Sequence, residues 1–145
     1  NKFLINMLFK KIDNFANKFF GNFIFFAQFL LRLGLGIAFI IHGYSMLPLP
    51  PQKLIDFFNF SPLLASLVCV FELGSGILLI LSGFFTSYVG NILTRISSFI
   101  IVVIMSFAFY FAHQDWFINS KLFTSEQIFL FLIGIYFLIV GNKRI

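Results

Sequence analysis

Four long apolar stretches constrain this chain more than any other feature. A helix needs about 20 apolar residues, at 1.5 Å of rise each, to cross the hydrocarbon core of a bilayer. Stretches of about this length occupy residues 23–47, 62–85, 88–112 and 124–140. They are apolar on every side, whereas the strands of a membrane barrel alternate apolar and polar residues. The sequence therefore predicts an all-α fold, a four-transmembrane-helix bundle that begins near residue 23.

The composition excludes the soluble classes of protein. Hydrophobic residues make up 60% of the 145 residues and charged residues only 10%, and 25 residues are Phe. Soluble domains are about 45–50% apolar and about 25% charged, and a domain of this size cannot hide so much apolar surface from water. The net charge of +5 comes from basic residues at the ends of the stretches. We therefore expect a lipid bilayer, and no nucleic acid, around the chain.

Residues 1–22 have a different pattern, that of an amphipathic helix. At 100° per residue, one side is apolar and the other is polar and rich in lysine. The apolar side carries Leu4, Ile5, Leu8, Phe9, Ile12, Phe15, Ala16, Phe19 and Phe20, and the polar side carries Lys2, Asn6, Lys10, Lys11, Asp13, Asn14, Asn17 and Lys18. This pattern is typical of a helix that lies in the membrane interface. We expect a surface helix at 1–22, followed by the membrane domain at 23–145.

The distribution of basic residues predicts the orientation. One side of the membrane would hold both termini and the short loop after the second stretch, and the other side would hold the remaining loops. The first side carries Lys2, Lys10, Lys11, Lys18, Arg95, Lys143 and Arg144, and the second carries Lys53 and Lys121. Since basic residues collect on the cytoplasmic side, we expect both termini in the cytoplasm.

Two charged side chains lie deep inside the apolar stretches, where they are costly. Arg32 is about nine residues from the cytoplasmic start of the first stretch, and Glu72 is about ten to thirteen residues from the cytoplasmic end of the second. Both would be roughly 13–20 Å deep, so neighbouring antiparallel helices would bring them together. We expect a buried Arg32–Glu72 ion pair that joins the two helices. A ligand or proton site around Glu72 is the alternative.

Polar side chains also gather at the outer ends of the stretches. They are His42, His113, Asp115 and Glu126. Histidine can titrate, hydrogen-bond a quinone carbonyl or bind a metal, so these residues form either a ligand pocket or ordinary interhelical hydrogen bonds. No histidine pair at helical spacing and no Cys/His cluster is present, so no metal site is predicted. No complete catalytic motif occurs either, which leaves the catalytic residues unassigned and the question of enzymatic activity open.

The order of these features resembles the DoxX family. The run from Arg32 to Gly43 is similar to the first-span signature, and the run from Phe71 to Gly83, with Phe84-Phe85-Thr86, is similar to the second. The third stretch ends in His113, Glu126 opens the fourth, and Gly141-Asn142-Lys143-Arg144 closes a resemblance over about residues 28–145. It implies a small four-helix protein of the bacterial inner membrane, often a component of a redox assembly. Some relatives are linked to thiosulfate oxidation with quinone as acceptor, and others to oxidative-stress complexes.

Two hypotheses for the function follow. The first is an inner-membrane subunit of a larger assembly, such as a quinone-linked oxidoreductase complex, with quinone as the possible cofactor and His42, His113, Asp115 and Glu126 around its pocket. The second is an accessory or scaffold subunit without chemistry, which packs against larger membrane proteins through its Phe-rich faces.

Overall fold

The computed structural model describes residues 2–118 and 120–142. The regular elements of these two ranges are all helices, so the predicted all-α fold is confirmed. In chain order they are α1 (Lys2–Phe20), the 3-10 turn η1 (Gly21–Phe23), α2 (Ile24–Ser45), α3 (Gln52–Phe58), α4 (Pro62–Ser82), α5 (Tyr88–Ala112), the 3-10 turn η2 (Gln114–Ile118), α6 (Lys121–Thr124) and α7 (Glu126–Val140). The two basic residues at 143 and 144, which entered the orientation prediction, lie outside the described residues.

The long helices occupy the apolar stretches. Three helical segments are long and apolar enough to cross a membrane by length and composition: Lys2–Ser45, Pro62–Ser82 and Tyr88–Ala112. Helix α7 is apolar but has 15 residues, which span about 22 Å against a hydrocarbon core of about 30 Å. The bundle is thus that of a helical membrane protein, and a fourth crossing by α7 stays a prediction.

Local sequence explains where the helices begin and end. Ser61 caps α4 by accepting a hydrogen bond from the Leu64 N–H at 3.2 Å, and Pro62 occupies the first helical position, where its missing N–H costs nothing. Helix α2 ends three residues before Pro48. Helix α7 ends at Gly141, whose φ of 65° is in the region that favours glycine.

Consecutive long helices pack side by side: α2 against α4, α4 against α5, and α5 against α7. Glycine allows the closest approach. A Cβ atom on Gly36 would lie 2.9 Å from the Gly76 carbonyl oxygen, and one on Gly76 would lie 2.6 Å from the Gly36 oxygen. Gly34 and Gly74 face open space instead. Only some of the glycines in these helices therefore serve the contact between α2 and α4.

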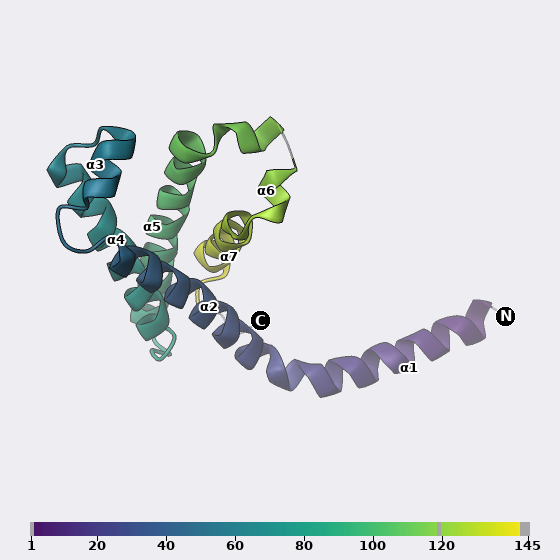
Figure 1. Ribbon diagram of the computed structural model, residues 1–145. Coiled ribbons are helices and arrows are strands. Elements are labelled where there is room, and N and C mark those ends of the chain that lie inside the picture. Colours follow the sequence, from purple (N-terminus) through teal and green to yellow (C-terminus); the bar gives the residue numbers. More distant parts are fainter. Residues whose placement is uncertain (1, 119, 143–145) are drawn as a thin grey trace.

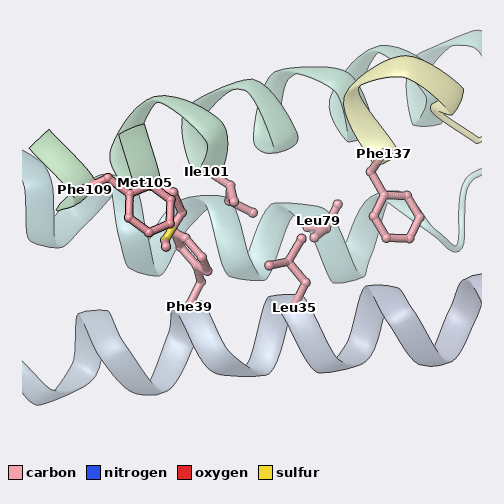
Figure 2. Packing of buried hydrophobic residues seen from close by; sticks show 7 residues of the cluster. All are labelled: Leu35, Phe39, Leu79, Ile101, Met105, Phe109 and Phe137. Atoms are coloured by element: carbon pink, nitrogen blue, oxygen red, sulfur yellow. The ribbon is translucent and has the colours of Figure 1, made fainter. Parts of the chain in front are cut away.

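The core between these helices is built from one apolar residue cluster (Figure 2). Its members are Leu35 and Phe39 of α2, Leu79 of α4, Ile101, Met105 and Phe109 of α5, and Phe137 of α7. The opposite faces of the same helices are also apolar and exposed, for example at Leu63, Ile92 and Ile139. Apolar side chains on both faces are expected when the surrounding solvent is lipid.

Helix α1 extends away from the bundle (Figure 1). It has no buried residue, and only η1 separates it from α2. The predicted amphipathic helix is therefore present as the leading part of a nearly continuous helical segment. Its position at the membrane surface stays a prediction.

Candidate functional site

The pairing of α2 with α4 determines which ionisable groups meet. Gly43 packs against Leu73 and Cys69, and Gly83 packs against the Arg32 side chain. Arg32 is thus opposite the last turn of α4, ten residues or about 15 Å along the helix from Glu72. The predicted Arg32–Glu72 ion pair is wrong. The depth of each residue was counted from the cytoplasmic end of its own apolar stretch. This count failed because α2 begins eight residues before Arg32, whereas α4 ends at the level of Arg32.

Arg32 instead joins all four long helices at one end of the bundle, which we call the Arg32 end. Its Nη1 donates to the Leu79 carbonyl oxygen at 2.8 Å, to Ser82 Oγ at 2.9 Å and to Thr94 Oγ1 at 3.0 Å. Its Nη2 donates to Asn142 Oδ1 at 2.5 Å, and the guanidinium carbon lies 4.7 Å from the ring centroid of Phe137. A cation at the C-terminal end of α4 is also favoured by the helix dipole.

Asn142 completes this network from the α7 side. Its Nδ2 donates to the carbonyl oxygens of Ser82, the last residue of α4, at 2.8 Å and of Phe85, in the loop that follows, at 3.1 Å. Its backbone N–H donates to Asn91 Oδ1 at 3.0 Å. Asn142 is thus a structural residue that the sequence prediction missed.

Helices α2 and α7 make few contacts with each other, and the hydrogen bonds that link their segments lie at the Arg32 end. Besides the bond from Arg32 to Asn142, Gln28 Nε2 donates to the Tyr136 hydroxyl at 3.0 Å. Toward the other end, which we call the His42 end, the two helices separate. A cavity lies at this end, and both His42 of α2 and Glu126 of α7 line it.

This cavity, which we call the His42 cavity, has a volume of about 570 Å³. Its walls come from α2, α3, α4, α5 and α7, and they are almost entirely apolar and aromatic, as at Phe39, Phe58, Phe71, Phe107 and Phe111. Pockets of about 300–1,000 Å³ with apolar walls and a few polar groups are typical of small-molecule sites.

Four of the polar residues that line the His42 cavity are ionisable: His42, Glu72, His113 and Glu126. Three of these belong to the predicted pocket, and the cavity brings them together. Asp115 does not line it but lies exposed on η2. Glu72 lines the cavity as well, at the position that the alternative sequence interpretation, a ligand site around Glu72, had proposed. The histidine at position 113 is stacked on the Trp116 ring, with centroids 3.7 Å apart.

The contact between His42 and Glu72 is the chemically distinctive part of the cavity. His42 Nδ1 lies 3.7 Å from Glu72 Oε2, a distance that allows electrostatic attraction but is too long for a hydrogen bond. The His42 side chain is largely exposed and that of Glu72 is buried, and Glu72 Oε2 has no hydrogen-bond partner among the described residues. A buried carboxyl oxygen without a partner is costly. Glu72 Oε2 is therefore available to a hydrogen-bond donor on a bound molecule.

The fold and the cavity together define a class: a small helical membrane protein with an apolar, histidine- and carboxylate-bearing cavity at one end. The family model described as DoxX matches residues 27–114, more than half of the chain. The chain therefore belongs to the DoxX family, as its sequence motifs predict. No curated protein sequence and no solved structure matches it significantly.

Proposed function

We propose that the chain is a membrane subunit of a quinone-linked oxidoreductase assembly and that the His42 cavity binds the quinone. The unpaired Glu72 oxygen beside His42, in a cavity with aromatic walls, is the observation that carries this proposal. A quinone ring fits a flat apolar slot, its carbonyl oxygens accept hydrogen bonds, and the hydroxyl groups of the reduced quinol donate them. Histidine can donate to the carbonyl, and the carboxylate can accept from the hydroxyl.

The proposal assigns binding and proton exchange to this chain, and electron transfer to a partner. Reduction of a quinone takes up two electrons and two protons. His42 and Glu72 are groups that can change protonation state next to the ring. Electrons would come from a redox centre in another subunit of the assembly.

The single tryptophan of the chain permits a direct binding test. Trp116 is stacked on His113, which lines the cavity, so a quinone bound there should quench its fluorescence. Decylubiquinone is titrated into the purified protein in mild detergent. We expect saturable quenching that Ala108→Phe, which fills the cavity, weakens strongly. The control is Val70→Phe, which adds a larger side chain on an exposed face of α4. Equal quenching of both variants would reject the cavity as the quinone site.

A second variant tests the role of the histidine in the native assembly. His42→Ala should lower quinone-linked electron transfer in membranes while leaving the thermal unfolding temperature unchanged, because His42 is largely exposed and contributes little packing. Unchanged turnover would contradict the proposal.

The alternative function, an accessory subunit without chemistry, is favoured by α1. All of its large apolar side chains are exposed, including Phe3 at 76% and Phe15 at 73%, so this helix needs a lipid surface or a partner protein to cover it. A pull-down from native membranes in mild detergent separates the two functions. Haem, flavin or quinone in the eluate supports the redox assembly, and colourless co-purification with a non-redox complex supports the scaffold.

We also propose that the protein lies in a bacterial inner membrane with α1 on the cytoplasmic surface. Lys2, Lys10, Lys11 and Lys18 on the polar face of α1 support this orientation because anionic lipids attract them. Cys69 is the sole cysteine and is buried, so a Cys69→Ser background is suitable for labelling. Lys10→Cys should react with a membrane-impermeant thiol reagent only from the cytoplasmic side, and Lys53→Cys only from the other side. The reverse pattern would overturn the orientation.

A further inference from the structure

A second cavity, which we call the Arg32 cavity, has a volume of about 550 Å³ and lies at the Arg32 end of the bundle. Its polar lining consists of Gln28, Arg32, Thr86 and Asn142. It is separate from the His42 cavity, with which it shares no lining residue. Neither the quinone proposal nor the DoxX assignment gives this second cavity a role.

Arg32 brings an uncompensated positive charge to this cavity. A guanidinium is always protonated in proteins, yet the partners of Arg32 described above are neutral carbonyl, hydroxyl, amide and aromatic groups. No ion pair in the described part of the chain includes it. The five acidic residues of the chain are all elsewhere, on α1 or toward the His42 end: Asp13, Asp56, Glu72, Asp115 and Glu126.

The position of the cavity along the helices limits which anions can reach it. Arg32 is opposite the last turn of α4, and the cavity includes Thr86, in the loop that leads to α5, and Asn142, directly after α7. Helix ends in a membrane bundle lie near the lipid headgroups, where phosphate is the abundant anion. Arg32 is only 5% exposed, so an anion in contact with it is attracted with little screening by water.

The remaining walls of the cavity are aromatic. They are formed by Phe25, Phe29 and Phe85. The side chains of Phe25 and Phe85 are about half exposed on the outer surface of the bundle. A ligand that joins a phosphate to acyl chains can therefore place its phosphate beside Arg32 and its chains against these rings. A free phosphate ion would contact only the polar residues of the cavity and leave its aromatic walls uncovered.

We propose that the Arg32 cavity binds the phosphate group of a membrane phospholipid. Arg32 supplies the positive charge, the Thr86 hydroxyl supplies a further hydrogen-bond donor at the mouth of the cavity, and the phenylalanine rings contact the acyl chains. The bound lipid neutralises the buried guanidinium and fills the space between the ends of α2, α4 and α7. It is a structural lipid of the bundle and takes no part in quinone chemistry.

The test compares three probes on the full chain, purified in mild detergent and washed free of lipid. They are dioleoylphosphatidylglycerol, dioleoylglycerol, which lacks the phosphate, and inorganic phosphate. Native mass spectrometry measures retention of the lipids, and the thermal unfolding temperature measures stabilisation by each probe. We expect retention and stabilisation with phosphatidylglycerol only. Equal effects of dioleoylglycerol would overturn a phosphate site, and equal stabilisation by inorganic phosphate would overturn the assignment to lipid.

A matched pair of variants locates the site. Thr86→Glu introduces a carboxylate at the mouth of the cavity, whereas Thr86→Gln introduces a neutral side chain of the same size, and neither removes a hydrogen bond of Arg32. The glutamate should compete with the phosphate for Arg32. We expect phosphatidylglycerol to bind about tenfold more weakly to Thr86→Glu than to Thr86→Gln, or roughly 1.4 kcal/mol. Equal affinities in two folded variants would place the lipid elsewhere and overturn the proposal.

Discussion

Replacing Arg32 with methionine should destabilise the bundle more than any other removal of a basic side chain. The substitution keeps an unbranched apolar stem and removes the guanidinium that contacts α4, α5 and α7. Nη1 carries two hydrogens shared among three acceptors, and Nη2 donates to Asn142, so about three hydrogen bonds are lost. The contact with the Phe137 ring is lost as well.

The net cost is smaller than the sum of these bonds. Hydrogen bonds from a charged donor contribute about 1.5–3 kcal/mol each, or roughly 4.5–9 kcal/mol for three. Methionine also avoids the desolvation of a buried cation, which offsets several kcal/mol of that loss. The hydroxyl groups of Ser82 and Thr94 stay hydrogen-bonded to each other at 2.8 Å, so neither is left without a partner. We therefore expect a loss of about 3 kcal/mol in the free energy of unfolding.

The assay is reversible unfolding in mixed detergent micelles, followed by circular dichroism. The control is Arg95→Met, because Arg95 is only half-buried and makes, within the described residues, one hydrogen bond, from Nη1 to the Leu138 carbonyl oxygen at 2.6 Å. It should cost about 1 kcal/mol, less than a fully buried charged hydrogen bond, because solvent screens a half-buried group. A double-mutant cycle between Arg32→Met and Asn142→Leu should show coupling of about 1 kcal/mol or more, since the two side chains are directly bonded. A loss with Arg32→Met no larger than that with Arg95→Met would show that the Arg32 network does not hold the helices together.

Three further substitutions test the packing of the bundle and the tryptophan probe. Gly76→Leu should lower the thermal unfolding temperature because its Cβ meets the Gly36 carbonyl, and Gly74→Leu, which faces open space, should not; equal losses would reject the close contact. Gly141→Ala should destabilise by about 1–2 kcal/mol in the same unfolding assay, because φ is 65° and the new Cβ collides with Asn91 Oδ1; an unchanged value would contradict that backbone geometry. His113→Leu removes the ring stacked on Trp116 and should shift its emission spectrum, whereas an identical spectrum would show that the rings are not in contact.

Hydropathy was sufficient to predict the helices because their apolar residues face lipid as well as the core. It located the stretches that became α2, α4, α5 and α7. The hydropathy of a sequence does not show how far one helix is shifted along its axis relative to its neighbour. That position depends on where small residues allow backbones to approach, as at Gly36 and Gly76. A pairing inferred from depth alone therefore matched Arg32 with the wrong residue.

The candidate site was predictable to a similar extent. His42, His113 and Glu126 were identified because ionisable groups near the same ends of neighbouring helices must lie near one another. Asp115 was included on the same ground, but η2 leaves it exposed outside the cavity. Asn142 was missed because an asparagine just after a helix is ordinary as a sequence signal. Its role follows only from three chain segments that converge on it.

Quinone binding in the His42 cavity is tested by photochemical cross-linking of an azidoquinone to the protein in native membranes. Adducts are mapped by peptide mass spectrometry, with excess unmodified quinone as competitor. We expect competed adducts on the faces of α2, α5 and α7 that line the His42 cavity, around His42, His113 and Glu126. Adducts spread over the lipid-exposed faces and insensitive to the competitor would contradict quinone binding there.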